Sequence, residues 1–161
     1  MNYTLVDKDD ASKKLLKKTT KMKLKEMDQL EVEYMGQTSV EALGGGIANS
    51  SYCKIIVDTQ GEPQAVFGVV DTPAGYAIPW LLTTSEHRIT KEWLKHCKNV
   101  IYPEMCDERK MFTNVCFKDN HATKRWLKWL GFRFQRFDDN CDRFLMDVEG
   151  ITSDKDEVYN V

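Results

Sequence analysis

Two stretches decide the fold, YAIPWLLT at Tyr76–Thr83 and KMFTNVCF at Lys110–Phe117. Both are apolar runs of strand length that contain aromatic and branched side chains. Between them Thr90 can cap a helix, whose apolar residues recur at helical spacing: Trp93, Leu94, Cys97, Val100 and Ile101. A strand, a helix and a second strand in this order predict a right-handed crossover with the two strands parallel.

The chain before this unit predicts a meander of antiparallel strands. Cys53–Asp58 and Gln64–Val70 are apolar runs, and the turns Thr59–Pro63 and Asp71–Gly75 separate them from each other and from Tyr76–Thr83. Turns that contain glycine and proline are typical of such connections. Pro79 lies inside the last run, and because proline has no N–H, it predicts an edge, a bulge or a place where strands diverge.

The N-terminal part predicts one short strand and three helices. The strand is Tyr3–Val6, and Asp9 or Asp10 can cap the first helix, which takes in Leu15, Leu16, Met22 and Leu24. A second helical stretch runs from Met27 to Met35, and a third covers Ser39–Leu43. Gly44-Gly45-Gly46 favours the end of the third helix, the alternative being a close approach of backbone to a ligand.

The C-terminal part predicts a second strong helix and a hairpin. Asn120 can cap a helix that ends at Leu130, with Gly131 after it at positive φ. The strands Phe132–Phe137 and Arg143–Val148 follow. The complete order indicates an α+β fold, with a mixed central sheet and helices on both faces. We expect one domain over residues 1–148 and an acidic, flexible tail over residues 149–161.

Composition restricts the class of protein. The 161 residues are 42% hydrophobic and 30% charged, which is typical of a soluble globular domain. The longest apolar stretch, Tyr76–Leu82, is too short to span a membrane, and the N-terminus lacks the pattern of a secretory signal. The net charge of −2 carries no general nucleic-acid signature.

Seven lysines fall between Lys13 and Lys25. They predict a solvated helix face, the alternative being a patch that binds phosphate or an acidic partner. No aromatic residue is interleaved with these lysines, which argues against stacking of single-stranded nucleic acid.

The cysteines and histidines do not have the spacing of a metal site. The five cysteines are Cys53, Cys97, Cys106, Cys116 and Cys141, without a CxxC pair, and the histidines are His87, His96 and His121. We expect reduced, mostly buried thiols and no metal.

The stretch NHATKRWLKWLGF, Asn120–Phe132, resembles the N-x-x-A-x-x-L-Y-x-x-x-GF segment of the GNAT superfamily of N-acetyltransferases. Asn120 takes the place of the family's asparagine, which by this resemblance makes it a candidate cofactor-binding residue, and Gly131-Phe132 takes the place of the terminal GF. The order of elements extends the resemblance over roughly residues 1–148. It implies a GNAT-like sheet in which two parallel strands splay apart and the pantetheine arm of acetyl-CoA inserts between them.

A narrower resemblance lies in GEPQAVFGVV, WLLTTSEH and RWLKWLGFRF. These runs are similar to small GNAT-like proteins of short-tailed bacteriophages, some of them internal virion or morphogenesis proteins. This resemblance implies a bacteriophage origin, a location in the cytoplasm of the bacterial host or in the virion, and phage or host proteins as partners.

The resemblance also places a cofactor site. If the strand departs at Pro79, the backbone groups of Leu81, Leu82 and Thr83 would be free to bond an inserted amide chain. In the family's Q/R-x-x-G-x-G/A loop, Arg88 matches the first position, but Lys91 and Trp93 stand at the glycines. We expect Trp93 to crowd a pyrophosphate, and therefore weak or no binding of acetyl-CoA, the alternative being a side-chain clamp by Arg88 and Lys91.

The catalytic residues of the family are not all matched. Leu127 stands where the family has a tyrosine, and the nearest titratable side chains are Glu86 and His87. Three functions follow as hypotheses. The chain is a non-catalytic virion-assembly or internal virion factor, an acetyl-CoA-dependent N-acetyltransferase with an atypical phosphate clamp, or an interaction module that uses its basic N-terminal helix.

Overall fold

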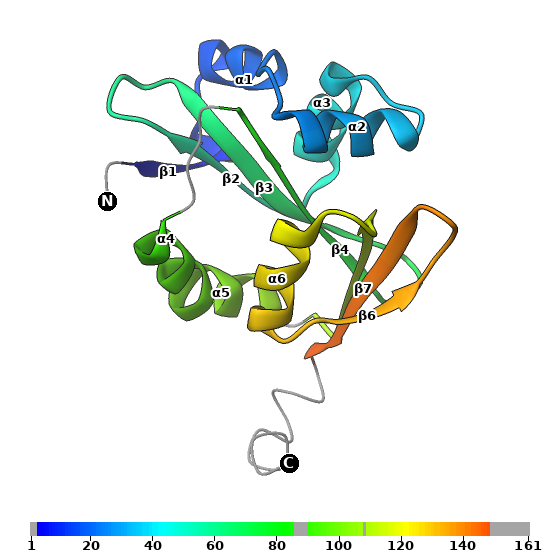
Figure 1. Ribbon diagram of the computed structural model, residues 1–161. Coiled ribbons are helices and arrows are strands. Elements are labelled where there is room, and N and C mark those ends of the chain that lie inside the picture. The colour runs from blue at the N-terminus through cyan, green and yellow to red at the C-terminus, as the bar shows by residue number, and fades with distance from the viewer. Residues whose placement is uncertain (1–2, 86–89, 108, 149–161) are drawn as a thin grey trace. The chain divides into compact units, whose positions relative to one another are not determined.

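The computed structural model describes residues 3–85, 90–107 and 109–148. Its strands form one seven-stranded sheet in the order β1-β2-β3-β4-β5-β7-β6 (Figure 1). The strands are β1 (Thr4–Asp7), β2 (Tyr52–Val57), β3 (Pro63–Asp71), β4 (Ala77–Thr83), β5 (Met111–Phe117), β6 (Arg133–Arg136) and β7 (Cys141–Asp147). β4 and β5 pair in parallel, whereas β1–β2, β2–β3, β5–β7 and β6–β7 pair antiparallel. The mixed α+β fold and the parallel pair across the crossover are confirmed.

The helices follow the predicted order. They are α1 (Lys13–Thr20), α2 (Glu26–Tyr34), α3 (Ser39–Asn49), α4 (Lys91–His96), α5 (Tyr102–Cys106) and α6 (His121–Leu130), with a 3₁₀ turn at Lys8–Asp10 and a π turn at Cys97–Ile101. The chain divides into two compact units, Met1–Val70 with Trp80–Cys97, and Asp71–Pro79 with Lys98–Val161.

The first unit has helices on both faces of its strands. Val66 of β3 belongs to a core that α1, α2 and α3 cover, together with Cys53, Ile55, Leu43 and Val32. The next residue, Phe67, contacts Trp93 of α4, with ring centroids 6.5 Å apart. Because successive side chains of a strand point to opposite faces, α4 covers the face opposite to α1–α3.

The predicted end of the third helix at Gly44 is wrong, since α3 continues to Asn49. A capping box between Thr38 and Glu41 fixes its start. A Cβ atom at Gly46 would lie 2.8 Å from the ring of Trp80. Glycine is used here for close packing of the helix and not for its termination.

The predicted cap of the first helix is also wrong. Asp7 caps the 3₁₀ turn, in which Asp9 and Asp10 lie, and the side chain of Ser12 caps α1 by accepting a hydrogen bond from the Leu15 N–H. The short turn moves the start of the helix to Lys13, and α1 ends at Thr20, before Met22 and Leu24.

In the second unit, the helical segment between β4 and β5 changes to a π turn before Pro103. Proline has no N–H to donate along the helix, which disturbs the regular hydrogen bonding there. Gly131 ends α6 with φ of +113°, which confirms the predicted positive φ. The chain then forms the β6–β7 hairpin, whose second strand begins at Cys141, two residues earlier than predicted.

Aromatic rings form the core of the second unit. Tyr102, Phe112, Phe132 and Phe144 lie in successive contact, with centroids 5.3–6.5 Å apart. The predicted tail, residues 149–161, lies outside the described residues.

Candidate functional site

The ladder between β4 and β5 is short. Among the residues that the structure describes, Ala77 and Phe112 are the one matched pair of these strands. Pro79, two residues further, has no N–H, and its carbonyl oxygen accepts a hydrogen bond from Asn114 Nδ2 at 2.8 Å. A side-chain amide thus replaces the bond that a backbone ladder would provide, and Pro79 marks the place where the ladder stops.

Two different sets of partners bond the carboxyl end of β4. The Thr84 N–H donates to the Gln64 carbonyl at 3.0 Å, which lies on the β3 side. The Thr83 N–H instead donates to Asp28 Oδ2 at 2.8 Å, and the Thr83 carbonyl accepts from the Lys25 N–H at 2.9 Å. The segment before α2 therefore occupies the backbone of Thr83.

Alternation along the strand gives the direction of the backbone groups of Leu81 and Leu82, the two residues before Thr83. The N–H and C=O of one residue point to one side of a strand, and those of the next residue to the other side. The backbone of Leu81 therefore points away from β3, as that of Thr83 does, while the backbone of Leu82 points toward β3. Of the three residues that the sequence predicts to be free, the Thr83 backbone is occupied and the Leu82 backbone points toward β3, so Leu81 is the one whose backbone can face an inserted chain. A role of Leu81, Leu82 and Thr83 in cofactor binding stays a prediction.

Asp28 is a buried carboxylate that the sequence analysis missed. It is 7% exposed, and its Oδ2 also accepts a hydrogen bond from Thr83 Oγ1 at 3.2 Å. Burial raises the pKa of Asp28, while Lys25, whose Nζ lies 4.0 Å from Oδ1, and the bonds from Thr83 act in the opposite direction. The sequence contains one signal for the burial of Asp28. The buried residues Leu24 and Val32 lie four positions before and after it, a spacing that places side chains on the same face of a helix.

At the start of α4, the Trp93 side chain does not lie where the sequence predicts it. Thr90 Oγ1 accepts a hydrogen bond from the Trp93 N–H at 3.1 Å. The Trp93 side chain is 6% exposed and packs against Phe67 and His96. The prediction that Trp93 crowds a pyrophosphate is wrong, because its ring lies in the core. Lys91 is exposed at the first position of the helix.

Three predicted site residues lie outside the described residues: the catalytic candidates Glu86 and His87, and the phosphate candidate Arg88. Their roles stay predictions.

Asn120 has a structural role at the start of α6. It is 5% exposed, and its Oδ1 accepts a hydrogen bond from the Thr123 N–H at 3.3 Å. Leu127, in the family's tyrosine position, is buried. The cap is the one that the sequence predicts, and contact of Asn120 with a cofactor stays a prediction.

The five cysteines, all of them among the described residues, form no disulfide bond, and the three with shifted pKa values are poor nucleophiles. Burial raises the pKa of Cys53 and of Cys106 to about 11, and that of Cys97 to about 12. The thiol form therefore dominates at neutral pH. In the described part of the chain, no three His, Cys, Asp or Glu side chains are placed to hold a metal ion.

A shallow pocket of about 440 Å³ lies in the second unit, beside the turn between β3 and β4. Arg109 and Asp71 line it and form an ion pair, with Nε 2.9 Å from Oδ1. The pocket contains none of the site residues that the sequence predicts.

Comparison with known proteins rests on structure. No family model matches the chain, and no curated protein matches its sequence. A single-site mutant of the spermidine N-acetyltransferase SpeG from Vibrio cholerae matches with a TM-score of 0.62 and 10% identity, over 96% of this chain and 98% of that one. A GNAT-family acetyltransferase from Bacillus anthracis matches with a TM-score of 0.63 and 5% identity, over 92% and 96%. An aminoglycoside 6′-acetyltransferase type Ii matches with a TM-score of 0.60 and 12% identity, over 92% and 97%.

The chain therefore has the fold of the GNAT acetyltransferases. The three proteins compared above are acetyltransferases, and they give no support to the resemblance to phage virion proteins. No helix within the described ranges is both long and apolar enough to cross a membrane.

Proposed function

We propose that the chain is an N-acetyltransferase that uses acetyl-CoA and acts on an amine. The observation that carries the proposal is the backbone of Leu81, which points away from β3 between Pro79, where the ladder stops, and Thr83, whose backbone is occupied. Such a residue offers one N–H and one C=O to an amide chain, as in strand addition. The GNAT fold supports the same function.

The residues of β4 fit the pantetheine part of acetyl-CoA. The Leu81 N–H would donate to a pantetheine carbonyl, and the Leu81 carbonyl would accept from a pantetheine amide. Bound acetyl-CoA supplies the acetyl group as a thioester. Exposed Lys91, with Arg88, would supply positive charge for the phosphates.

Acetyl transfer to nitrogen needs a neutral amine and an acceptor for its proton. Asp28 is a candidate general base, because it contacts the end of β4 and is more readily protonated than an exposed aspartate. Glu86 and His87 remain candidates for the same role.

The test is a calorimetric titration with acetyl-CoA of the wild type and of two variants at one position. Leu81→Pro removes the N–H that points away from β3, as Pro79 does naturally on the same side of the strand, whereas Leu81→Val keeps it. Loss of one hydrogen bond costs about 1 kcal/mol, so we expect binding roughly fivefold weaker in Leu81→Pro and nearly unchanged in Leu81→Val. Circular dichroism checks that both variants fold.

Two results contradict the proposal. One is a folded wild type that gives no heat with acetyl-CoA up to millimolar concentration. The other is equal binding by Leu81→Pro and Leu81→Val, which would place acetyl-CoA away from β4.

A non-catalytic role in virion assembly is the second candidate. Leu127 favours the non-catalytic part of this hypothesis, because a buried leucine cannot protonate a departing thiolate. Release of free CoA thiol in the presence of a panel of primary amines distinguishes the two functions, since a virion factor releases none with any amine.

A further inference from the structure

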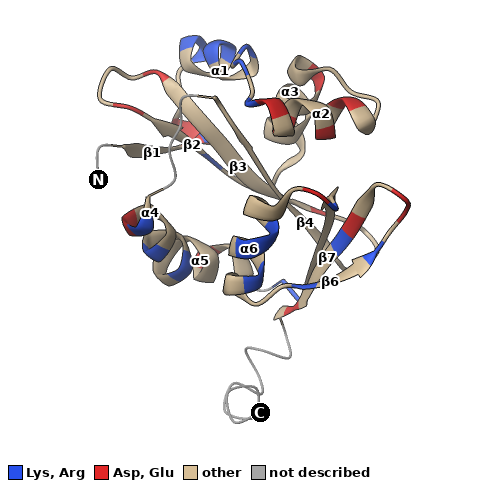
Figure 2. Ribbon diagram, viewed as in Figure 1, with Lys and Arg blue, Asp and Glu red and all other residues tan. Residues whose placement is uncertain are grey.

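Seven lysines lie in one short basic segment of the first unit, which we name the lysine surface: Lys13, Lys14, Lys17, Lys18, Lys21, Lys23 and Lys25. No acidic residue occurs from Ala11 to Lys25, and Figure 2 shows α1 as a basic helix. The other 16 of the 23 basic residues stand against 25 acidic ones. A surface of charge +7 thus belongs to a chain whose remaining residues carry −9.

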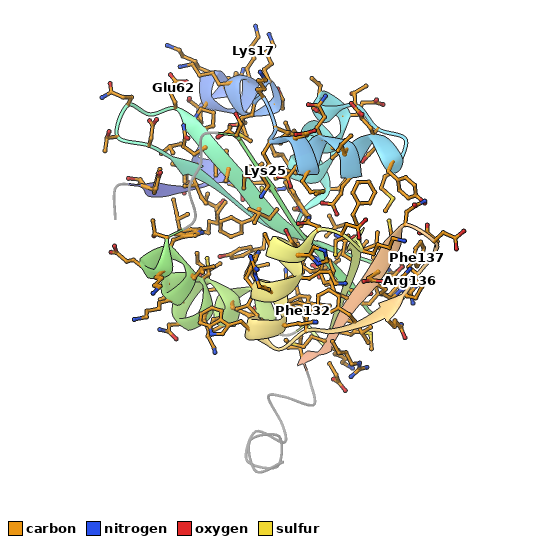
Figure 3. All side chains as sticks on the ribbon, in the orientation of Figure 1. Lys17, Lys25, Glu62, Phe132, Arg136 and Phe137 are labelled. Carbon is orange, nitrogen blue, oxygen red and sulfur yellow. The ribbon has the colours of Figure 1, made fainter. Side chains whose placement is uncertain are left out.

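Most of this charge is not neutralised by the chain itself. Lys18 bonds Glu62 at 2.7 Å and Lys25 lies 4.0 Å from Asp28, and the described residues provide no acidic partner for the other five. Those five side chains, Lys13, Lys14, Lys17, Lys21 and Lys23, are exposed. Figure 3 shows Lys17 extending outward from α1.

The arrangement weakens the helix that carries it. Lys13, Lys17 and Lys21, the residue that caps the C-terminus of α1, follow one another at intervals of four residues, and like charges at this spacing destabilise a helix. Lys13 and Lys14 also stand in the first turn, where the helix dipole favours acidic residues, and α1 has none there. An anionic partner would relieve both effects, whereas a merely solvated face would gain from mixed charges.

We propose that the lysine surface docks an acidic, extended segment of another protein. Lysines four residues apart on a helix rise by about 6 Å. In an extended chain, every second side chain lies on one face, about 6.6 Å from the last. Alternating acidic residues can therefore meet the row Lys13, Lys17 and Lys21 one to one. This proposal does not depend on acetyl transfer.

An acidic segment fits this surface better than a nucleic acid does. The surface contains neither arginine nor aromatic side chains, which would clamp phosphates bidentately or stack on bases. A long nucleic acid would also meet the acidic remainder of the chain, whereas a short segment reaches the lysines alone.

The test uses the full chain and a fluorescein-labelled peptide of alternating glutamate and serine, with binding followed by anisotropy. Replacing the row by Lys13→Gln, Lys17→Gln and Lys21→Gln should weaken binding about tenfold. The control triple, Lys95→Gln, Lys110→Gln and Lys128→Gln, removes the same charge from exposed lysines elsewhere and should change it less than twofold. Glutamine is a good helix former, so the first triple should melt no lower than the wild type.

Three results overturn the proposal. Equal weakening by both triples would indicate a response to net charge alone. Equal binding of a glutamine–serine peptide would exclude recognition of acidic side chains. Tighter binding of duplex DNA than of the peptide, lost in the first triple only, would assign the surface to nucleic acid.

Discussion

Asp28 shows how one long-range contact changes the chemistry of a side chain. Its carboxylate is buried against β4 and accepts two hydrogen bonds from Thr83, so its pKa is raised mainly by desolvation. A carboxylate in this position costs stability when it is ionised.

Asp28→Asn keeps an oxygen for Thr83 and removes the charge. Because the folded pKa of Asp28 is raised, its contribution to stability is fully present below the ordinary pKa of 3.8 and is lost as pH rises through the raised value. We therefore expect the melting temperature of Asp28→Asn, relative to the wild type, to increase from pH 4 to pH 7. Thermal unfolding at several pH values measures this.

A difference in melting temperature that does not change with pH would contradict the expectation. Asp28→Ala is the control, because it leaves the buried Thr83 N–H without its partner. It should destabilise at every pH by about 1–3 kcal/mol.

Gly131 is a position where only glycine fits without strain. Its φ is +113°, and an added Cβ would lie 2.9 Å from Met146 Cε. Gly131→Ala should destabilise the fold by about 1–2 kcal/mol through the backbone alone. Gly61→Ala is the matched control, since its φ is +77° and an added Cβ meets nothing within 4 Å.

Denaturant unfolding compares the two variants. We expect Gly131→Ala to be the less stable one, by the cost of moving Met146 and by the larger strain of its φ of +113° compared with +77° at Gly61. A variant Gly131→Ala as stable as the wild type would show that the end of α6 does not require the left-handed conformation.

At the scale of the element, α3 contains glycines with opposite roles. Gly44 is open, with nothing within 4 Å of an added Cβ, whereas a Cβ at Gly46 would lie 2.8 Å from Trp80. That ring is fixed, because Trp80 Nε1 donates to Ser50 Oγ at 2.7 Å.

Alanine at the two positions should therefore act in opposite directions. Gly44→Ala should stabilise by about 1 kcal/mol through helix propensity. Gly46→Ala should destabilise by about 1–3 kcal/mol, because the helix and Trp80 must move apart. Urea unfolding of both variants tests the pair, and a shift of both in the same direction would refute the role of Trp80.

Local sequence patterns predict the strands of this protein better than they predict the length of α3, because a long-range contact determines where α3 ends. The strands β2, β3 and β4 are apolar runs bounded by turns, so their positions could be predicted from neighbouring residues. Three consecutive glycines locally disfavour a helix, but α3 continues through them because it packs against Trp80, a residue of β4. The start of α3 had a local signal, the Thr38–Glu41 capping box.

For the whole molecule, the order of elements follows from the apolar runs and the turns between them, and the parallel β4–β5 pair follows from the crossover rule. The candidate site was less accessible to prediction, because long-range hydrogen bonds define it. Proline at position 79 indicates that a ladder stops, but it cannot reveal that Asp28 and Lys25 occupy Thr83. Motif position alone also misplaced Trp93, whose direction is set by burial against Phe67.

An open strand is a hazard for solubility as well as an opportunity for binding. Exposed backbone groups on a strand are a template for the strands of other molecules, and so for aggregation. On the side of β4 away from β3, Pro79 offers no N–H and the backbone of Thr83 is occupied. A foreign strand would gain backbone hydrogen bonds only at Leu81, and these are too few for stable strand pairing. A short amide chain can bind with the hydrogen bonds of this one residue. The bonds that delimit the candidate site thus also limit the pairing of a foreign strand with this part of β4.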